Sequence, residues 1–588
     1  MSGKRYCAVL GELTFNTALH IGVGRGGVGT DSPLRRNNRG EIILPGTAMA
    51  GALRSLATRL APYLSLPDGK RSTCLALEPK QPEDTQNSKT PQICGCPVCH
   101  LFGEIRPNEN AAERLGGRAS RLWVYDAAMR HATGTFVRDG VGIDRETGTA
   151  ARAGRVKFDQ EILPAGAVFA IRLELDDASE EDQMLLAATL AEWMAGRSWL
   201  GGGAGRGLGN ATLTNVRYVK NSMADSKELL TFLKSTDPVS SAQEEPAWLA
   251  SNLTQARARV DLGGKPFVET EFDLQFEGLF LTQDATAAGM LGFDHVSLID
   301  GVPGFTPGLK PVLPGSGLRG ALRSHAERIA RTLASYQAMQ KGKAEGAAQI
   351  FKNTCPACNP LQDNPKLPLA RCSELNNLPP RTEPSDDQLC LGCRLFGSSQ
   401  RGSRLRVMDA PISGEPIWKA VDFLAIDRFT GGSLEGAKFD AAALWKPTFR
   451  VRLFLEEPED WELGWMALVL RDLFEGYIPI GFGAAKGFGH ALGKNLTLRC
   501  GFLSDKDWGG LAREKELQGA AGFYRMAAFT HPDWQTGMTE VTNWTKRFLS
   551  ELSGVKRRQE FLEPLQVDTY FDKLESLYPM DGKEDHHA

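Results

Sequence analysis

Two groups of cysteines have the spacing of metal ligands. They are Cys74, Cys94, Cys96 and Cys99 in the first half of the chain, and Cys355, Cys358, Cys390 and Cys393 in the second. Paired Cys-x-x-Cys motifs are typical of tetrahedral thiolate coordination of zinc, in which no position stays open for a substrate. The second group fits this pattern; in the first, Cys74 stands alone and either Cys94 or His100 could be the fourth ligand. We expect two structural zinc ions, and buried thiols at Cys7, Cys372 and Cys500.

A glycine-rich stretch occurs twice, with one cation at the same place in each copy. Residues 200–210 read LGGGAGRGLGN and residues 480–490 read IGFGAAKGFGH, so that Arg206 corresponds to Lys486. Glycine allows positive φ and a close approach of backbone amides to a ligand, and a neighbouring cation favours an anion. Because the pattern is repeated with the cation in register, we predict that both loops hold a phosphate chain.

Other repeated segments are the elements that must position these residues. Alternating apolar residues predict opening strands at 6–21 and 268–281. Each strand leads through an irregular loop to a Pro-Gly-Thr or Pro-Gly-Ser sequence, where Thr47 and Ser316 are expected to be helix N-caps. The amides at these helix starts form a second candidate anion site. Further along, VGIDRETG at 141–148 and LAIDRFTG at 424–431 are expected to be exposed hairpins.

The repeats divide the chain into four parts. We expect a first repeat domain at residues 1–222, a linker at 223–265 with a helix near 226–234, a second repeat domain at 266–500 and a helical C-terminal extension at 501–588. The 588 residues include 42% apolar ones, enough for full-sized cores. No stretch predicts a membrane span or a secretory signal, so we expect a cytoplasmic protein. The net charge of −3 means that a polyanion must be held by local cations.

The order of these motifs resembles the RAMP superfamily, and in particular the backbone subunits of type III CRISPR-Cas effector complexes. The resemblance covers residues 6–218 and 268–498, and two such units in one chain resemble the fused double-backbone subunits of III-D-like effectors. It implies an α+β fold with two tandem ferredoxin-like, RRM-related domains, each with a zinc-binding insertion and a thumb hairpin. It also implies three kinds of partner: a guide RNA (crRNA), a target RNA and other subunits of the effector complex.

The resemblance assigns roles to the repeated residues. It places on the guide RNA Gly46, Thr47, Arg54, Gly201, Gly203, Arg206, Gly207 and Gly209, and in the second half Gly315, Ser316, Arg323, Gly481, Gly483, Lys486, Gly487 and Gly489. The thumb hairpins that part the guide–target duplex would carry Ile143, Asp144, Arg145 and Thr147, and Ile426, Asp427, Arg428 and Thr430.

In this family an aspartate in the loop after the first strand cuts the target RNA. The reaction uses a divalent metal such as Mg²⁺, and the ribose 2′-OH is the nucleophile. Asp31 lies at the matching place in the first half, and the second half offers Asp294 or Asp300. We prefer Asp294, because like Asp31 it follows a glycine by two residues.

Two other functions share most of these motifs. A scaffold subunit that binds the guide–target duplex without cutting it needs everything except the loop aspartates, so Asp31 and Asp294 favour the endoribonuclease. A guide-processing ribonuclease needs a histidine for acid–base chemistry. His20 and His295 lie near the loops, but neither has a counterpart in the other half.

Overall fold

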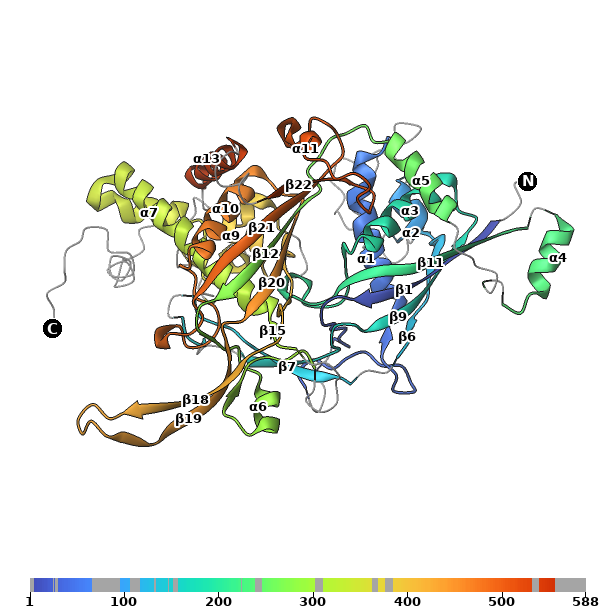
Figure 1. Ribbon diagram of the computed structural model, residues 1–588. Helices are drawn as coiled ribbons and strands as arrows, with labels where there is room; N and C mark the ends of the chain where they lie inside the picture. The colour runs from blue at the N-terminus through green and yellow to red at the C-terminus, as the bar shows by residue number, and fades with distance from the viewer. Residues whose placement is uncertain are drawn as a thin grey trace, which may run out of the picture.

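The computed structural model describes residues 5–24, 26, 30–65, 96–105, 117–131, 134–145, 148–151, 157–223, 225–237, 239, 246–301, 310–361, 369–375, 384–530 and 539–555. The two halves of the chain form two bodies that lie side by side, each with helices packed on a β-sheet (Figure 1). A long hairpin, β18–β19, stands out from the second body.

The first half opens on a strand and ends on one. Its strands are β1 (Arg5–Phe15), β2 (Ile43–Leu44), β3 (Glu104–Ile105), β4 (Gly117–Arg118), β5 (Leu122–Val124), β6 (Ala127–Met129), β7 (Phe136–Val141), β8 (Lys157–Ile162), β9 (Val168–Asp176), β10 (Ser198–Trp199) and β11 (Asn210–Ser222). Its helices are α1 (Gly46–Leu60), α2 (Pro97–Phe102) and α3 (Glu180–Met194). The central sheet has the order β10-β11-β1-β9-β6-β2, and β5 also pairs with β9.

The second half repeats this plan. Its strands are β12 (Phe267–Phe276), β13 (Leu279–Phe280), β14 (His295–Val296), β15 (Val312–Leu313), β16 (Leu405–Val407), β17 (Ala410–Pro411), β18 (Trp418–Ile426), β19 (Ser433–Trp445), β20 (Thr448–Glu456) and β21 (Ala491–Phe502). Its helices are α6 (Ala285–Leu291), α7 (Gly315–Thr354), α8 (Cys372–Leu375), α9 (Leu391–Phe396) and α10 (Asp460–Phe474). In both halves, strand, helix, two strands, helix and strand follow one another, and in both the last strand pairs antiparallel with the first.

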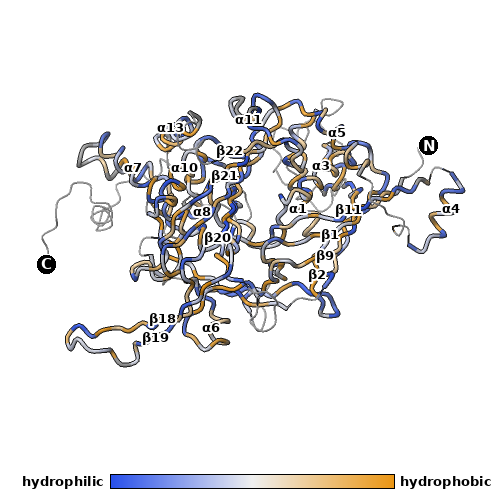
Figure 2. The backbone as a smooth tube through the Cα atoms, in the orientation of Figure 1, coloured by the Kyte–Doolittle hydropathy of each residue, from blue (hydrophilic) through white to orange (hydrophobic). Residues whose placement is uncertain are grey.

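Sequence periodicity explains these elements. In β9 every second residue, from Phe169 to Leu175, is buried, as expected for a strand with one face on the core. In α7 the alanines Ala326, Ala330, Ala334 and Ala338 recur every fourth residue and are at most 2% exposed, so they form a helical stripe against the core. Hydrophobic and hydrophilic residues alternate along the central strands in Figure 2.

The two Pro-Gly motifs begin helices, but not with the caps expected from sequence. Pro45 and Pro314 occupy the N-cap positions and make no side-chain cap hydrogen bond, so Thr47 and Ser316 lie inside the first turn. The amide of Gly46 donates instead to Asp126 Oδ1 at 2.7 Å, and that of Gly315 donates to Asp409 Oδ1 at 2.8 Å. An aspartate from the following strand region thus satisfies the helix start.

The linker and the C-terminal extension are more structured than predicted. The expected linker helix is α4 (Ser226–Lys234), and a second helix, α5 (Pro246–Ala258), was not predicted. The extension contains α11 (Leu511–Glu514) and α13 (Thr539–Gly554), but also β22 (Arg525–Thr530), which pairs with β21 as an edge strand of the second sheet. A purely helical extension was therefore the wrong expectation, because open hydrogen-bonding groups on β21 are satisfied by this strand.

The extension also ties the second half to the first. Glu192 at the end of α3 forms a buried ion pair with Arg197 at 2.5 Å and accepts the amide of Phe523 at 2.6 Å. Arg197 in turn donates to the carbonyl of Ala521 at 3.0 Å. The Glu192 side chain is only 1% exposed, so its charge depends on these partners.

We predict that Glu192→Ala destabilises the whole chain. Removing one member of a buried ion pair leaves Arg197 uncompensated, which costs about 3–5 kcal/mol. Thermal unfolding followed by differential scanning fluorimetry should show a clear fall in the midpoint, while the control Glu181→Ala, which removes an exposed partner of Arg259, should leave it nearly unchanged. Equal thermal unfolding midpoints for both variants would contradict a stabilising role of the Glu192–Arg197 ion pair.

Candidate active sites and metal centre

The loop aspartates of the two halves occupy equivalent positions. The amide of Asp31 donates to Asp159 Oδ1 at 2.5 Å, and the amide of Asp159 donates to Asp31 Oδ2 at 3.2 Å. In the second half Asp294 and Asp440 exchange the same two bonds, at 2.8 and 2.9 Å. Asp31 and Asp294 are exposed, and each is fixed to the second strand of its hairpin, β8 or β19.

Asp300 does not share this environment. It lies where the halves meet, and its Oδ2 accepts the amide of Ala165 at 3.2 Å. Burial raises the pKa of Asp300, and Arg138 only partly opposes this effect. An exposed carboxylate that repeats the contacts of Asp31 is a better candidate for the second site than the partly buried Asp300, so Asp294 stays the preferred candidate.

A cation and an aromatic ring lie beside each aspartate pair. Phe158 and Phe439 directly precede Asp159 and Asp440. The guanidinium carbon of Arg206 lies 5.8 Å from the ring centre of Phe158, and the Nζ of Lys486 lies 4.9 Å from that of Phe439. Each glycine-loop cation therefore packs on the same hairpin strand that binds the loop aspartate, one residue before the aspartate's partner, and sequence could not show this role of Asp159 and Asp440.

The glycine loops have the predicted positive φ angles, but several of their backbone amides already donate hydrogen bonds within the protein. All eight predicted glycines have positive φ, from 76° to 109°. The amides of Gly209 and Gly489 donate to Ala18 and Leu279, and those of Arg206 and Lys486 donate to the glycine three residues before. Since these amides are satisfied internally, the feature that both loops present outward is the exposed cation.

Each hairpin has the predicted Ile-Asp-Arg turn. Ile143 and Ile426 are 54% and 61% exposed, and the ring of Phe429 is fully exposed. Hydrophobic residues, coloured orange in Figure 2, lie along the protruding β18–β19 hairpin. The amides of Phe429 and Thr430 donate to the Asp427 carboxylate, which shapes the tip. Thr147 lies outside the described residues.

Several residues expected on RNA face the protein interior instead. Gly46 and Gly315 are buried, with their amides on Asp126 and Asp409. Arg323 is 9% exposed and donates to Glu327, to the carbonyl of Gly397 and to Cys393 Sγ at 3.7 Å. Arg54 donates to Cys99 Sγ at 3.6 Å in the first half. Arg54 and Arg323 thus brace the cysteine loops, and their contact with RNA stays a prediction.

Positive charge gathers where the halves meet. Burial, reinforced by Arg323, Arg206 and Arg145, lowers the pKa of Arg319 to about 10. Arg319 also donates to the carbonyl of Phe396. So many neighbouring guanidinium groups favour an anion at this place, and Arg319 was not predicted from sequence because its counterpart in the first half is Ala50.

The two histidines near the loops are not arranged for acid–base chemistry. His20 is 4% exposed, and its ring nitrogens contact the Glu161 carbonyl at 2.8 Å and the Ser32 hydroxyl at 2.9 Å. His295 lies against the rings of Phe439 and Phe482. Both positions are packing positions, which weakens the guide-processing alternative.

Four buried cysteines in the second half form a candidate metal centre. They are Cys358, Cys372, Cys390 and Cys393, whose sulfur atoms all lie within 4.8 Å of one another. Tetrahedral Zn–S bonds of about 2.3 Å place ligand sulfurs about 3.8 Å apart, and the Cys358 and Cys393 sulfurs are separated by 3.5 Å. The set fits zinc, and the amides of Cys390 and Cys393 donate to Cys372 Sγ and Cys390 Sγ, as thiolates require.

The ligand set differs from the sequence prediction by one residue. Cys372, expected to be a buried thiol, belongs to the cluster, whereas Cys355 packs in the hydrophobic core and its thiol donates to the carbonyl of Ala357 at 3.2 Å. The Cys355-x-x-Cys358 spacing was misleading, because Cys355 ends α7 and faces away from the cluster. In the first half Cys96 and Cys99 are buried, and Cys74 and Cys94 lie outside the described residues.

His100, the other candidate ligand of the first half, already has a partner. Its Nδ1 lies 2.7 Å from an Asp182 oxygen, and Asp182 also closes the capping box of α3 with Ser179. Such a bond to the second ring nitrogen is also how carboxylates orient histidine ligands, so the choice between Cys94 and His100 stays open.

We predict at least one tightly held zinc per chain, bound by the second group. Cys372→Ser should lower the zinc content by one per chain and reduce the midpoint of thermal unfolding, because the metal stabilises its own loop. Cys355→Ser is the matched control and should keep the zinc. The measurement is elemental analysis of protein purified without chelator. If only the Cys355 variant loses zinc, Cys355 rather than Cys372 is the ligand, as the sequence predicted.

Comparisons with known proteins are consistent with this geometry. The RAMP superfamily profile matches residues 12–212 and 298–491, once in each half. The chain is also similar to the protein named CRISPR system Cms endoribonuclease Csm3 of Methanocaldococcus jannaschii, with 25% identity over 220 residues, which are 36% of this chain and 79% of that protein. Among the described residues no helix is long and apolar enough to cross a membrane.

Proposed function

Because the chain belongs to the RAMP superfamily, we propose that it is a guide-RNA-binding backbone subunit of a type III CRISPR effector that cuts complementary target RNA at two sites. The similar archaeal protein is named an endoribonuclease of such a system. We assign each half one ferredoxin-like domain, supported by the repeated order of strands and helices. Guide RNA, target RNA and other effector subunits would be its partners.

One observation carries the proposal of two cutting sites. Asp31 with Asp159 and Asp294 with Asp440 make the same reciprocal bonds, and in each half a glycine-loop cation packs on the ring of the residue before the partner aspartate. A turn aspartate with a purely local role has no reason to recur with the same long-range partner. The repeated pair supports the proposal of two copies of one reaction site.

The guide would be held by its phosphates. Arg206 and Lys486 are exposed on equivalent loops, and Arg319 lies near Arg206 where the halves meet. Contacts of such cations to phosphates position an RNA and carry no sequence information. This pattern supports binding that is independent of guide sequence, with sequence read by base pairing alone.

The reaction needs little from the protein beyond positioning. The hairpin, inserted beside the duplex, would disturb one step so that a target 2′-oxygen lines up with the adjacent phosphorus. The 2′-oxygen forms a bond to phosphorus as it loses its proton, and the 5′-oxygen leaves and gains one, giving a cyclic phosphate and a 5′-hydroxyl. A hydrated Mg²⁺ would supply charge neutralisation at the phosphate. Asp31 and Asp294, as exposed carboxylates fixed by an amide, have the donor chemistry to hold it.

We predict that each aspartate is responsible for one cut. With the complex assembled on a guide and an end-labelled target, Asp31→Ala should remove one product and Asp294→Ala the other, each by at least about a hundredfold in rate. Both variants should bind target as the native chain does, because the loop cations are unchanged. Mapping products with and without Mg²⁺ makes the measurement.

The controls separate this proposal from a scaffold. Glu415→Ala, at an exposed position, and Asp300→Asn should retain both cuts. Replacing the 2′-OH at a scissile position by hydrogen should abolish that cut. If neither aspartate variant affects cleavage, the chain is a scaffold and another subunit carries the nuclease.

We predict that Arg206→Ala and Lys486→Ala weaken guide binding equally for unrelated guide sequences. Each variant removes about one phosphate contact, so the slope of log affinity against log salt should become shallower by nearly one unit. Filter binding at several salt concentrations tests this, with Lys227→Ala on the exposed helix α4 as the control. A loss limited to particular guide sequences would contradict phosphate binding.

A further inference from the structure

The same surface is covered in the second half and open in the first. Residues 405–407 pair with β20 in the same antiparallel register in which residues 122–124 pair with β9. Residues 408 and 409 therefore correspond to residues 125 and 126. Met408 and Asp409 are 3% and 6% exposed because the first half lies on them. Their counterparts Tyr125 and Asp126 are exposed, and Trp123 is 58% exposed. We call Trp123, Tyr125 and Asp126 the open face.

The covered copy shows what such a face accepts. The first glycine loop lies on it so closely that a Cβ on Gly207 would stand 2.0 Å from Asp409 Oδ1, and one on Gly315 would stand 2.7 Å from Gly207 Cα. Arg138 of the first hairpin donates to Asp409 Oδ2 at 2.6 Å in a buried ion pair. A carboxylate on this face therefore receives a cation from the unit that covers it, and Asp409 and Asp300 raise the pKa of Arg138 despite its burial.

A second contact forms further along the same joint. Arg145, at the hairpin tip, pairs with Glu327 on α7. Arg406 stacks on Trp199, with its guanidinium carbon 4.3 Å from the ring centre. These contacts, with the Arg138–Asp409 pair, are the polar and aromatic determinants of the joint between the halves.

The free end of the second half lacks the residues that the open face would need. By strand register Val421 occupies the place of Arg138, since each precedes the aspartate opposite Asp159 or Asp440. Pro479 stands in place of Trp199, and Thr58 of α1 stands in place of Glu327. A second copy would therefore bury Asp126 without a cation and bring Arg428 against a threonine.

We propose that the open face binds a RAMP domain of a different chain, which presents a cation to Asp126, and that it rejects a second copy of this chain. The inference rests on the proposed function only in naming the partner class. Burying an unpaired carboxylate is costly, so the mismatch acts against self-assembly as effectively as a clash. The exposed rings of Trp123 and Tyr125 then become the apolar centre of the interface.

Sedimentation of the full chain without RNA tests the rejection directly. The native chain should stay monomeric at concentrations at which the double variant Val421→Arg, Thr58→Glu self-associates at least about tenfold more tightly. Adding Asp126→Asn, which keeps an oxygen for the Gly46 amide but removes the charge, should reverse the gain. Self-association of the native chain that Trp123→Glu abolishes would overturn the proposal, and so would a double variant that remains monomeric while its thermal midpoint is native.

The partner is tested in the reconstituted effector. Native mass spectrometry of the complex with guide RNA should find the open face of this chain on another RAMP subunit, with one copy of this chain per complex. Asp126→Asn and Trp123→Ala should each release that neighbour at least about tenfold more readily. Two adjacent copies of this chain would overturn the proposal. Because the sedimentation test uses no RNA, its outcome is independent of whether the chain cuts target.

Discussion

The joint between the two halves depends on one close approach of backbone to backbone. Gly207 of the first glycine loop lies against Gly315 at the start of α7, and Asp409 binds both the Gly315 amide and Arg138. A side chain at either glycine would separate the halves. Since Asp31 and Asp294 are each bonded to a hairpin strand of their own half, this contact also contributes to the spacing of the two aspartates. The distance between the two proposed cutting sites thus follows from the packing of the halves.

The two halves share the residues of the proposed function, and they differ in the residues of their contact surfaces. Where both copies agree, as in the aspartate pairs and the loop cations, the shared residues are those that the proposed reaction needs in each half. Where they differ, as at Arg138 and Val421 or at Glu327 and Thr58, one copy lies inside the chain and the other at its end. A symmetric pair of domains would polymerise through such a head-to-tail contact. The differences in charge between the end surfaces of the two halves would oppose such head-to-tail assembly of identical chains.

Sequence alone predicted the family, the repeats and the positive φ of all eight loop glycines, because these depend on local residue type and spacing. It failed where contacts between residues far apart in the sequence decide the outcome. The sequence favoured Cys355 as a ligand and Cys372 as a buried thiol, and only the folded arrangement of the sulfur atoms reverses the two. Thr47 looked like a cap because the competing acceptor, Asp126, comes much later in the chain. Asp159 and Asp440 carried no signal at all, since their partners are more than a hundred residues away.

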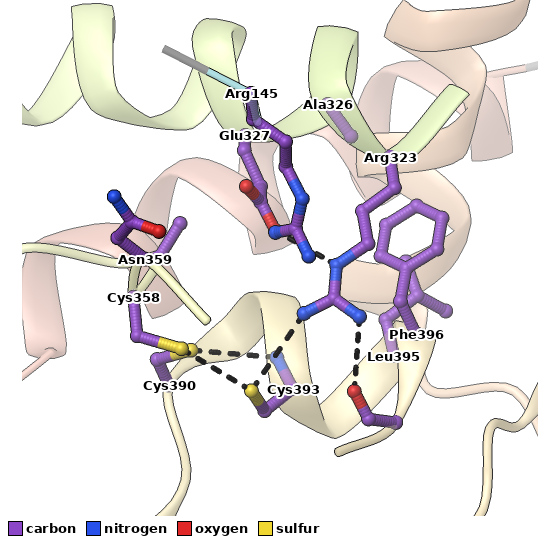
Figure 3. A network of polar contacts seen from close by, with 12 residues as sticks. Arg145, Arg323, Ala326, Glu327, Cys358, Asn359, Cys390, Cys393, Leu395 and Phe396 are labelled. Carbon is purple, nitrogen blue, oxygen red and sulfur yellow. Dashed lines mark hydrogen bonds and ion pairs between the residues drawn. The ribbon is translucent and has the colours of Figure 1, made fainter. Parts of the chain in front are cut away.

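The cysteine cluster reaches further than its own loop. Cys393 receives Arg323, Arg323 pairs with Glu327, and Glu327 pairs with Arg145 at the tip of the first hairpin, as Figure 3 shows. Four thiolates around one Zn²⁺ carry a net charge of about −2, which Arg323 is placed to balance. Without the metal the thiols would keep protons, and Arg323 would lose that counter-charge. A metal bound there would therefore stabilise Arg323 and, through Glu327, the contact to Arg145, so the cluster of one half would help to position the hairpin of the other.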